Sequence, residues 1–219
     1  MIAWDQLGEY APLLLMGALA TVRVSVGAIL LSIPLGLLWA LATLSGKALL
    51  AKPVTYLINL VRGTPMIVLL FYIYFVAPDL GVQLNAMDAA ILGLGFAYST
   101  YLAEIFRAGI EAVDAGQMEA ARSIGMGRVK AMRRVVLPQA FRLALPPLAN
   151  MFVMMVKDSA LASTISVNEV TRQGQLIAAS TFDNTTVYTL VAVLYLAMTL
   201  PLMSFTKWLE QRFGKHRDR

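Results

Sequence analysis

Cysteine is absent from this 219-residue chain, and histidine and charged residues are scarce. Without cysteine the chain has no disulfide framework, no thiol nucleophile and no thiolate metal site. The single histidine, His216, lies in a charged C-terminal tail, so a metal cluster built on histidines of one chain is excluded. No reactive constellation for an intramembrane enzyme is left, and neither a catalytic residue nor a metal site is expected.

Charged residues make up 14% of the chain and hydrophobic residues 58%, and the mean hydropathy is +0.69. A typical soluble domain has about a quarter of its residues charged. Residues 185–206 contain no charge at all, and a helix of that length is sufficient to cross a bilayer. The apolar runs are continuous rather than alternating, which favours helices over barrel strands. The expected fold class is therefore all-α, a polytopic membrane protein.

Five membrane-spanning helices are expected from the apolar runs and the prolines and glycines between them. The predicted spans are residues 11–44, 54–77, 87–112, 137–156 and 187–205. No internal repeat or linker divides the sequence, so residues 1–219 are expected to form a single transmembrane domain. A cleaved signal peptide is not expected, because acids rather than Lys or Arg precede the first apolar run.

The distribution of Lys and Arg predicts the orientation, because cytoplasmic loops carry an excess of positive charge. An outside N-terminus and an inside C-terminus place 14 of the 18 basic residues on the inner side: Lys47, Lys52, Arg107, Arg122, Arg128, Lys130, Arg133, Arg134, Arg142, Lys207, Arg212, Lys215, Arg217 and Arg219. The basic excess is thus explained by the inner face of a lipid bilayer, and no nucleic acid partner is expected.

The densest basic cluster lies in the loop between the third and fourth spans. Glu119-Ala120-Ala121 favours a short helix, Gly125 and Gly127 bracket a turn, and Leu137-Pro138 opens the fourth span. Gly125 is expected where the backbone turns and a side chain would clash. One interpretation is an ordinary cytoplasmic loop whose charges only enforce topology.

The spacing of this loop favours a more specific interpretation. Glu119-Ala-Ala, Gly125, Val135 and Leu137-Pro138 are similar in register to the EAA loop of ATP-binding-cassette (ABC) importer permeases, with Val135 where isoleucine is usual. The resemblance implies a cytoplasmic coupling helix that docks on a separate ATPase subunit. The implied coupling residues are Glu119, Ala120, Ala121, Gly125, Leu137 and Pro138.

Further motifs resemble the polar amino acid uptake branch of that family (histidine-, glutamine- and glutamate-type permeases). These are Leu60-Val-Arg-Gly-Thr-Pro65, Tyr101-Leu-Ala-Glu-Ile-Phe-Arg107, Gly116-Gln117, Leu137-Pro-Gln139 and Lys157-Asp-Ser-Ala-Leu-Ala-Ser163. The resemblance spans about Ala18 to Phe205. It implies a multi-pass protein of the bacterial inner (cytoplasmic) membrane that imports a polar or charged amino acid.

The resemblance also implies the partners: an ABC ATPase subunit dimer, a second permease that is identical or homologous, and an extracytoplasmic amino acid-binding protein. The chain itself is expected to hold no cofactor, since ATP and Mg would be bound by the ATPase. Its two Gly-Lys pairs, at 46–47 and 214–215, lack the upstream glycine of a phosphate-binding loop. A self-contained channel or secondary transporter is the alternative, but it usually needs more spans or an inverted repeat.

Ionisable residues inside spans are expensive and are functional candidates by default. Arg62 and Thr64 are expected to border the substrate path, or Arg62 braces the loosened helix around Gly63 and Pro65 by binding freed carbonyls. Glu104 is a further candidate for the substrate path, but it can pair with Arg107 three residues on, and this pairing favours a structural role over ligand binding.

Asp158 and Ser159 end the fourth span. Asp158 can hold a substrate ammonium, or form a salt bridge with Lys157 or Arg172. Arg23, in the first span, has three open roles: pairing with a partner subunit, lining the path, or snorkelling.

Overall fold

The computed structural model describes residues 6–213, and helices with short turns account for this whole part of the chain. The elements, in order, are α1 (Leu7–Thr43), α2 (Ala48–Gly63), α3 (Met66–Phe71), the π-helical η2 (Tyr72–Val76), the 3-10 helix η3 (Ala77–Leu80), α4 (Ala86–Glu111), α5 (Ala115–Ser123), α6 (Arg128–Ala131), the π-helical η4 (Met132–Val136), α7 (Leu137–Asp158), the 3-10 helix η5 (Ser159–Ile165), α8 (Val170–Thr181) and α9 (Asn184–Phe213). The expected all-α class is confirmed. Lys215, His216, Arg217 and Arg219 lie outside the described residues.

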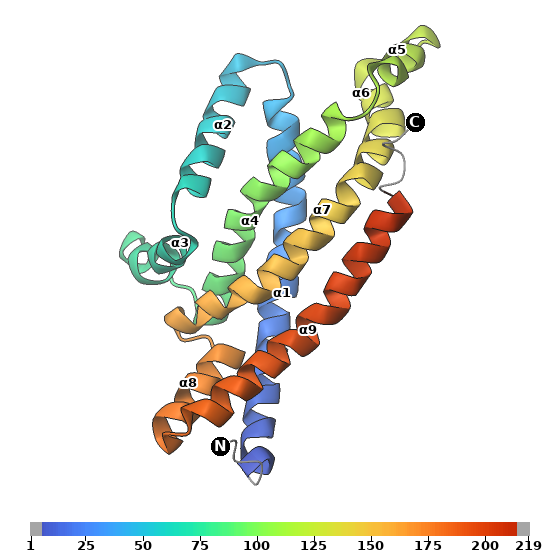
Figure 1. Ribbon diagram of the computed structural model, residues 1–219. Helices are drawn as coiled ribbons and strands as arrows, with labels where there is room; N and C mark the ends of the chain where they lie inside the picture. Colours follow the sequence, from blue (N-terminus) through green and yellow to red (C-terminus); the bar gives the residue numbers. More distant parts are fainter. Residues whose placement is uncertain (1–5, 214–219) are drawn as a thin grey trace.

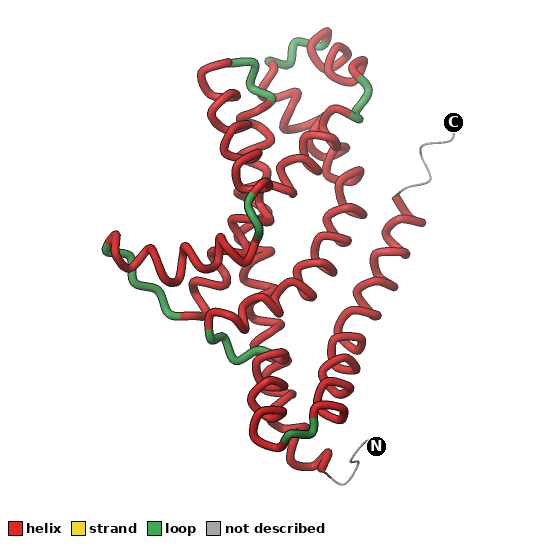
Figure 2. The backbone as a smooth tube through the Cα atoms, turned by 60° about the vertical axis from the view of Figure 1, so that its left-hand side comes forward, coloured by secondary structure: helices red, strands yellow, loops and turns green. Residues whose placement is uncertain are grey.

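Four segments of the described chain are long and apolar enough to cross a membrane as they stand. They are Gly8–Thr43, Ala86–Glu111, Arg128–Ile165 and Asn184–Phe213. A fifth crossing exists only if Ala48–Gly63 and Met66–Leu80 count as one span, and these two parts are bent by 103°. Figure 2 shows the second part projecting sideways from the bundle.

The bend follows from the local sequence. Thr64 is extended, with φ −97° and ψ 133°, and Pro65 follows it with φ −56°. A residue before proline is pushed out of the helical region, and proline itself has no N–H to donate. The loosening expected at Gly63 and Pro65 is therefore a complete break, which divides the predicted span 54–77 into two helices.

The core of the fold is the packing of α1 on α4. Gly36 of α1 lies against Leu102 and Ser99, and Gly95 of α4 lies against Ala28. Small residues at such contacts allow helix backbones to approach closely in a membrane. Trp39 Nε1 donates to Ser99 Oγ at 3.0 Å across the same contact. A second cluster of buried apolar side chains joins α1, α8 and α9.

The basic loops lie at one end of the helix bundle, and the remaining turns lie at the other end. The α1–α2 turn, α5, α6 and the C-terminal end of α9 lie at one end, and the N-terminus of α1 and α8 lie at the other (Figure 1). The loops chosen as cytoplasmic from their charge thus share one end of the molecule. Which side of a membrane this end faces stays a prediction.

Candidate functional site

Aromatic and charged side chains follow one another along α4 at helical spacing. Tyr98, Tyr101, Glu104, Arg107 and Glu111 are separated by three or four residues, so each lies beside the next in a row that winds partway around the helix, and we call this row the stripe. The rings of Tyr98 and Tyr101 have their centroids 6.1 Å apart. This stripe connects the break after α2 with the end of α7.

Arg62 reaches the stripe from the last turn of α2. Its Nη1 lies 3.9 Å from Glu104 Oε1, and its Cζ lies 5.3 Å from the centroid of the Tyr101 ring. A guanidinium over an aromatic face is attracted by the ring quadrupole. Arg62 forms no hydrogen bond to a freed carbonyl within residues 6–213, and Thr64 Oγ1 donates to Leu60 O at 2.9 Å.

Glu104 also binds Arg107, so the ion pair expected three residues apart is confirmed. Arg107 Nη2 donates to Glu104 Oε2 at 2.7 Å, and Arg107 Nη1 lies 2.9 Å from Glu111 Oε2. Glu104 and Arg107 face a concavity of about 720 Å³ between α4, α7 and the end of α9. Partly exposed ion pairs of this kind add little stability. Their effect is to hold the side chains of Glu104, Arg107 and Glu111 in fixed orientations.

Asp158 is held from the other end of the stripe. Tyr98 OH donates to Asp158 Oδ2 at 2.7 Å, and Tyr98 is 2% exposed. Neither Lys157 nor Arg172 forms an ion pair with Asp158 in the described part of the chain. The salt-bridge alternative for Asp158 is therefore not realised, and its carboxylate is oriented by a tyrosine instead.

The two predicted hydroxyl residues are bonded to their own helices. Ser159 is fully buried and its Oγ donates to Val156 O at 2.7 Å, while Thr64 bonds to Leu60 O. Both hydroxyl oxygens keep lone pairs that can accept from a ligand. Arg23 is exposed on α1, and the contacts within residues 6–213 do not decide among its three roles.

The loop between α4 and α7 contains the short helix α5 expected around Glu119. Asp114 caps it by accepting from Gly116 N at 2.8 Å. Glu119 and Ala120 are exposed, whereas Ala121 is 4% exposed and packs inward. Ala121 therefore serves the packing of the loop itself, while its two neighbours face away from the fold.

The C-terminal end of α5 requires glycine for a backbone reason. Gly125 has φ +83°, and a Cβ built on it meets nothing within 4 Å. The expectation that a side chain would clash there is wrong within this chain. The constraint is the left-handed backbone conformation, which residues other than glycine adopt only at a cost in conformational free energy.

One hydrogen bond ties α5 to the first turn of α7. Gln139 Nε2 donates to Gln117 Oε1 at 3.2 Å and to Val135 O at 3.0 Å. Leu137 and Pro138 form the start of α7, directly after the π-helical η4. This hydrogen bond therefore connects α5 with a helix that ends at Asp158.

Glu169 is a buried carboxylate that sequence reasoning missed. It is 0% exposed and caps α8, accepting from Thr171 N at 2.9 Å and from Arg172 N at 2.7 Å. Tyr195 OH of α9 donates to it at 2.8 Å, and Thr21 Oγ1 of α1 accepts from Val170 N at 3.3 Å. Glu169 lies between two candidate spans. Burial raises its pKa, and the hydrogen bonds from Thr171, Tyr195 and Arg172 oppose that shift.

A weak signal for part of this site was present in the sequence. Tyr98, Tyr101 and Glu104 are three residues apart, a helical spacing. This spacing could have predicted that the two tyrosines lie close to Glu104. Nothing comparable marked Glu169, whose partner Tyr195 is 26 residues away. No group of three or more metal-ligating side chains occurs in residues 6–213, so the described site offers no metal centre.

Comparisons with known proteins agree with this architecture. Residues 32–215 match the family model described as binding-protein-dependent transport system inner membrane component. The probable amino-acid ABC transporter permease protein YckA of Bacillus subtilis (strain 168) is 36% identical over 208 residues, which are 95% of this chain and 92% of that protein. The glutamine transport system permease protein GlnP of Escherichia coli (strain K12) is 34% identical over 211 residues, 95% of this chain and 96% of that one.

Solved structures show the same fold. The crystal structure of an amino acid ABC transporter with histidines contains a chain that superposes with a TM-score of 0.89 at 36% identity, over 97% of this chain and 99% of that chain. The resemblance to ABC importer permeases indicated by the sequence motifs is therefore confirmed. This chain belongs to the family of binding-protein-dependent transport system inner membrane components, the permease subunits of ABC transporters.

Proposed function

We propose that this chain is the transmembrane permease subunit of an ATP-driven ABC importer for polar or charged amino acids in the bacterial inner membrane. The observation that carries the proposal is α5, a short capped helix that stands at the end of the bundle where the basic loops gather (Figure 1). With the N-terminus outside and the C-terminus inside, this end faces the cytoplasm. The names of the relatives support amino acids as the substrate class.

The coupling role is assigned to α5 and its connection with α7. Glu119 and Ala120 offer an exposed polar and small surface on which a separate ATPase can dock, and Glu119 can accept charge-assisted hydrogen bonds from it. Gln117 then transmits the movement to Gln139 of α7, whose first residues are Leu137 and Pro138. The ATPase subunits bind ATP and Mg, and this chain is a non-catalytic membrane subunit.

The substrate path is assigned to the stripe on α4 and the residues it holds. An amino acid has an α-carboxylate that suits Arg62 and an α-ammonium that suits Asp158, and Glu104 keeps the guanidinium in place. Thr64 and Ser159 lie next to these charges in sequence and can add hydroxyl oxygens. Tyr98 orients Asp158, so it is a positioning residue for the ammonium.

The remaining partners follow from the same assignment. A second permease, identical or homologous, would complete the path across the bilayer, and an extracytoplasmic binding protein would deliver the amino acid. Capture experiments separate this proposal from a self-contained channel or secondary transporter. The full chain purified from native membranes should bring an ATPase subunit with it, whereas its consistent absence contradicts the importer proposal.

Gly125→Val is expected to abolish coupling while leaving the chain in the membrane. A β-branched residue at φ +83° is strained by roughly 1–3 kcal/mol, so the turn that ends α5 changes its geometry. The measurement is uptake of labelled amino acid together with capture of the ATPase. Gly127→Val is the matched control, because Gly127 has φ −63° and a Cβ there also meets nothing within 4 Å. Equal uptake by both variants would remove Gly125 from the coupling role.

Asp158→Asn and Arg62→Gln are expected to reduce uptake strongly, since each removes the charge that pairs with one end of the substrate. Tyr98→Phe should have a smaller effect, roughly tenfold, because it removes one hydrogen bond to a carboxylate. The measurements are uptake and ATPase activity stimulated by the loaded binding protein, with insertion checked by membrane extraction. Asp79→Asn, at an exposed carboxylate on η3, is the control. Normal uptake by the first two variants would exclude both residues from the path.

A further inference from the structure

The break between α2 and α3 leaves main-chain groups without partners. In a continuous helix, the carbonyl groups of Arg62 and Gly63 would each accept from the amide four residues later. Neither accepts a hydrogen bond within residues 6–213, because Pro65 turns the chain away and Thr64 N donates to Val61 O instead. Gly63 is exposed, and a Cβ built on it meets nothing within 4 Å. Two unpaired carbonyl groups therefore lie beside open space.

The depth of the break limits what can surround it. Counted as one crossing, the bent pair passes Lys52 and reaches Gly63 after roughly 16 Å of helical rise. The hydrocarbon core of a bilayer is about 30 Å thick, so the break lies near its middle. Non-helical backbone at this depth is tolerated only where protein covers it or where it lines a cavity that admits water.

The charged side chain next to the break favours a cavity. Arg62 extends from the same turn to Glu104 and to the ring of Tyr101. The side chains of Arg62 and Glu104 remain 39% and 36% exposed. Charged groups inside a span require water or a ligand around their exposed part. The last carbonyl groups of α2 are also the negative end of its helix dipole, which attracts a cation.

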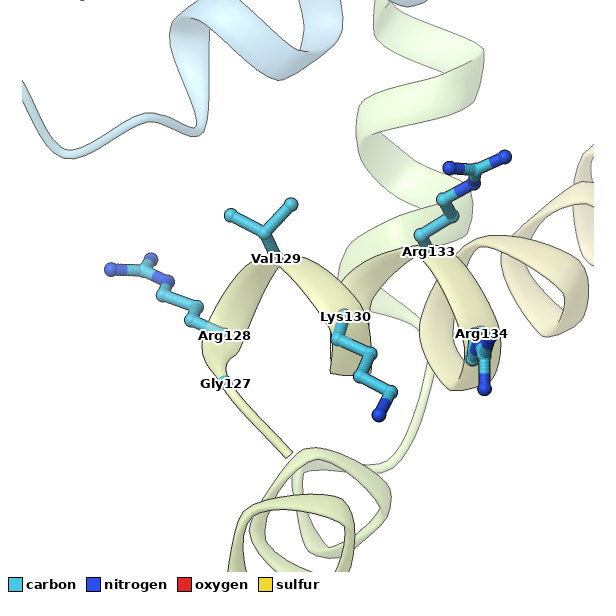
Figure 3. A pocket seen from close by; sticks show the side chains of 6 residues that line it. All are labelled: Gly127, Arg128, Val129, Lys130, Arg133 and Arg134. Atoms are coloured by element: carbon cyan, nitrogen blue, oxygen red, sulfur yellow. The ribbon is translucent and has the colours of Figure 1, made fainter. Parts of the chain in front are cut away.

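The hollow in the loop between α4 and α7 differs from the break. Around it, the side chains of Arg128, Val129, Lys130 and Arg133 point in different directions, so they do not converge on one ligand (Figure 3). That loop is also the one proposed to contact the ATPase. At the break, a guanidinium and two free carbonyl groups belong to neighbouring residues, which suits a small zwitterion.

We propose that the carbonyl groups of Arg62 and Gly63 form a main-chain subsite for the ammonium group of the amino acid. The inference rests on the proposed substrate path and adds to it a second acceptor besides Asp158. An ammonium group has three N–H donors, and a carbonyl oxygen accepts them without being charged itself. The unwound carbonyls and helix ends of interrupted spanning helices bind cations in the same way.

Gly63→Ala/Pro65→Ala should continue α2 into α3 and remove the subsite. It restores the N–H at position 65 and places a better helix former at position 63, so the free carbonyls can bond to the next turn. The thermal midpoint is expected to stay equal or to rise, while uptake of labelled amino acids falls roughly 10- to 100-fold. Pro53→Ala, at an exposed proline of the same helix, is the control and should keep normal uptake. Normal uptake by the double variant would overturn the inference.

A cysteine at the break tests its surroundings directly, since the chain has no cysteine of its own. The variants are labelled in native membrane vesicles opened to both sides, with a water-soluble methanethiosulfonate cation. Gly63→Cys is expected to react, whereas Leu30→Cys, 64% exposed on α1, should stay unreactive in lipid. A mixture of the common L-amino acids and L-cystine should slow the reaction at Gly63→Cys severalfold. Their Nα-acetyl derivatives, which lack the ammonium group, should not.

Each other labelling result contradicts the inference. An unreactive Gly63→Cys would show that lipid or protein covers the break. Reaction that the amino acids do not slow, or that the acetyl derivatives slow equally, would show a wet cavity without an ammonium subsite. Failure of the proposed function has a different signature: no ATPase is captured with the chain, whatever the reactivity at Gly63→Cys.

Discussion

Gly36→Leu is expected to separate α1 from α4 and to lower the thermal midpoint of the detergent-solubilised chain by roughly 5–15 °C. A Cβ at this position would lie 2.7 Å from Leu102 Cβ and 3.0 Å from the Ser99 carbonyl oxygen. These atoms belong to the backbone of α4 or are attached directly to it, so they cannot rotate away. The two helices must move apart, and the hydrogen bond from Trp39 to Ser99 is lost with them.

The control for this experiment lies in the same helix. Gly8→Leu adds the same side chain to the first turn of α1, where a Cβ meets nothing within 4 Å. It should leave the thermal midpoint within about 1–2 °C of the unmodified chain, as surface substitutions usually do. A midpoint for Gly36→Leu equal to that of Gly8→Leu would show that α1 and α4 do not pack through this glycine.

Glu169→Ala is expected to destabilise the fold by about 2–4 kcal/mol, because it removes one acceptor from several buried donors at once. The two amides at the start of α8 lose their cap, and Tyr195 OH loses its carboxylate partner. Freeing α8 would also release η5, the segment that leads directly back to Asp158. Uptake is therefore expected to fall together with the thermal midpoint.

A double-mutant cycle isolates the contact between α8 and α9. Tyr195→Phe should cost about 1 kcal/mol by itself, and less in the Glu169→Ala background, where only the hydrogen bond of Tyr195 OH with Thr171 Oγ1 remains. Tyr188→Phe on the same helix is the control, since Tyr188 is 45% exposed. Fully additive effects of Glu169→Ala and Tyr195→Phe would mean that the hydrogen bond between them contributes nothing to stability.

Much of the fold could be predicted from the sequence because it depends on local chemistry. The apolar runs predicted the candidate spans, with the fifth resting on the bent pair, and Pro65 with Gly63 predicted a loosening of the helix after Arg62, which the structure shows as a complete break. The loop motif around Glu119 predicted a short helix, which exists as α5. The size of the bend was not predictable, because the angle between two helices after a break is set by what each packs against.

The sequence predicted the charged residues of the candidate site but not the residues that they contact. Arg62 and Glu104 were chosen because ionisable side chains in spans are rare, and Asp158, at the end of a span, was chosen from the resemblance of its motif. The contacts of the tyrosines with these residues could be identified only from the tertiary structure, because Tyr98 and Asp158 are 60 residues apart in the sequence. Glu169 was missed for the same reason.

The sequence by itself determined that this protein is helical, suited to a membrane, weakened as a helix before Pro65 and basic at one set of loops. Hydropathy, proline geometry and charge act over a few residues, so the features that depend on them can be predicted from the sequence alone. Only the tertiary structure decided that α4 carries one stripe between Arg62 and Asp158, and that Glu169 fastens α8 to α9. Those contacts depend on how close the helices approach, and that distance is set by residues such as Gly36 and Gly95, whose partners are far away in the chain.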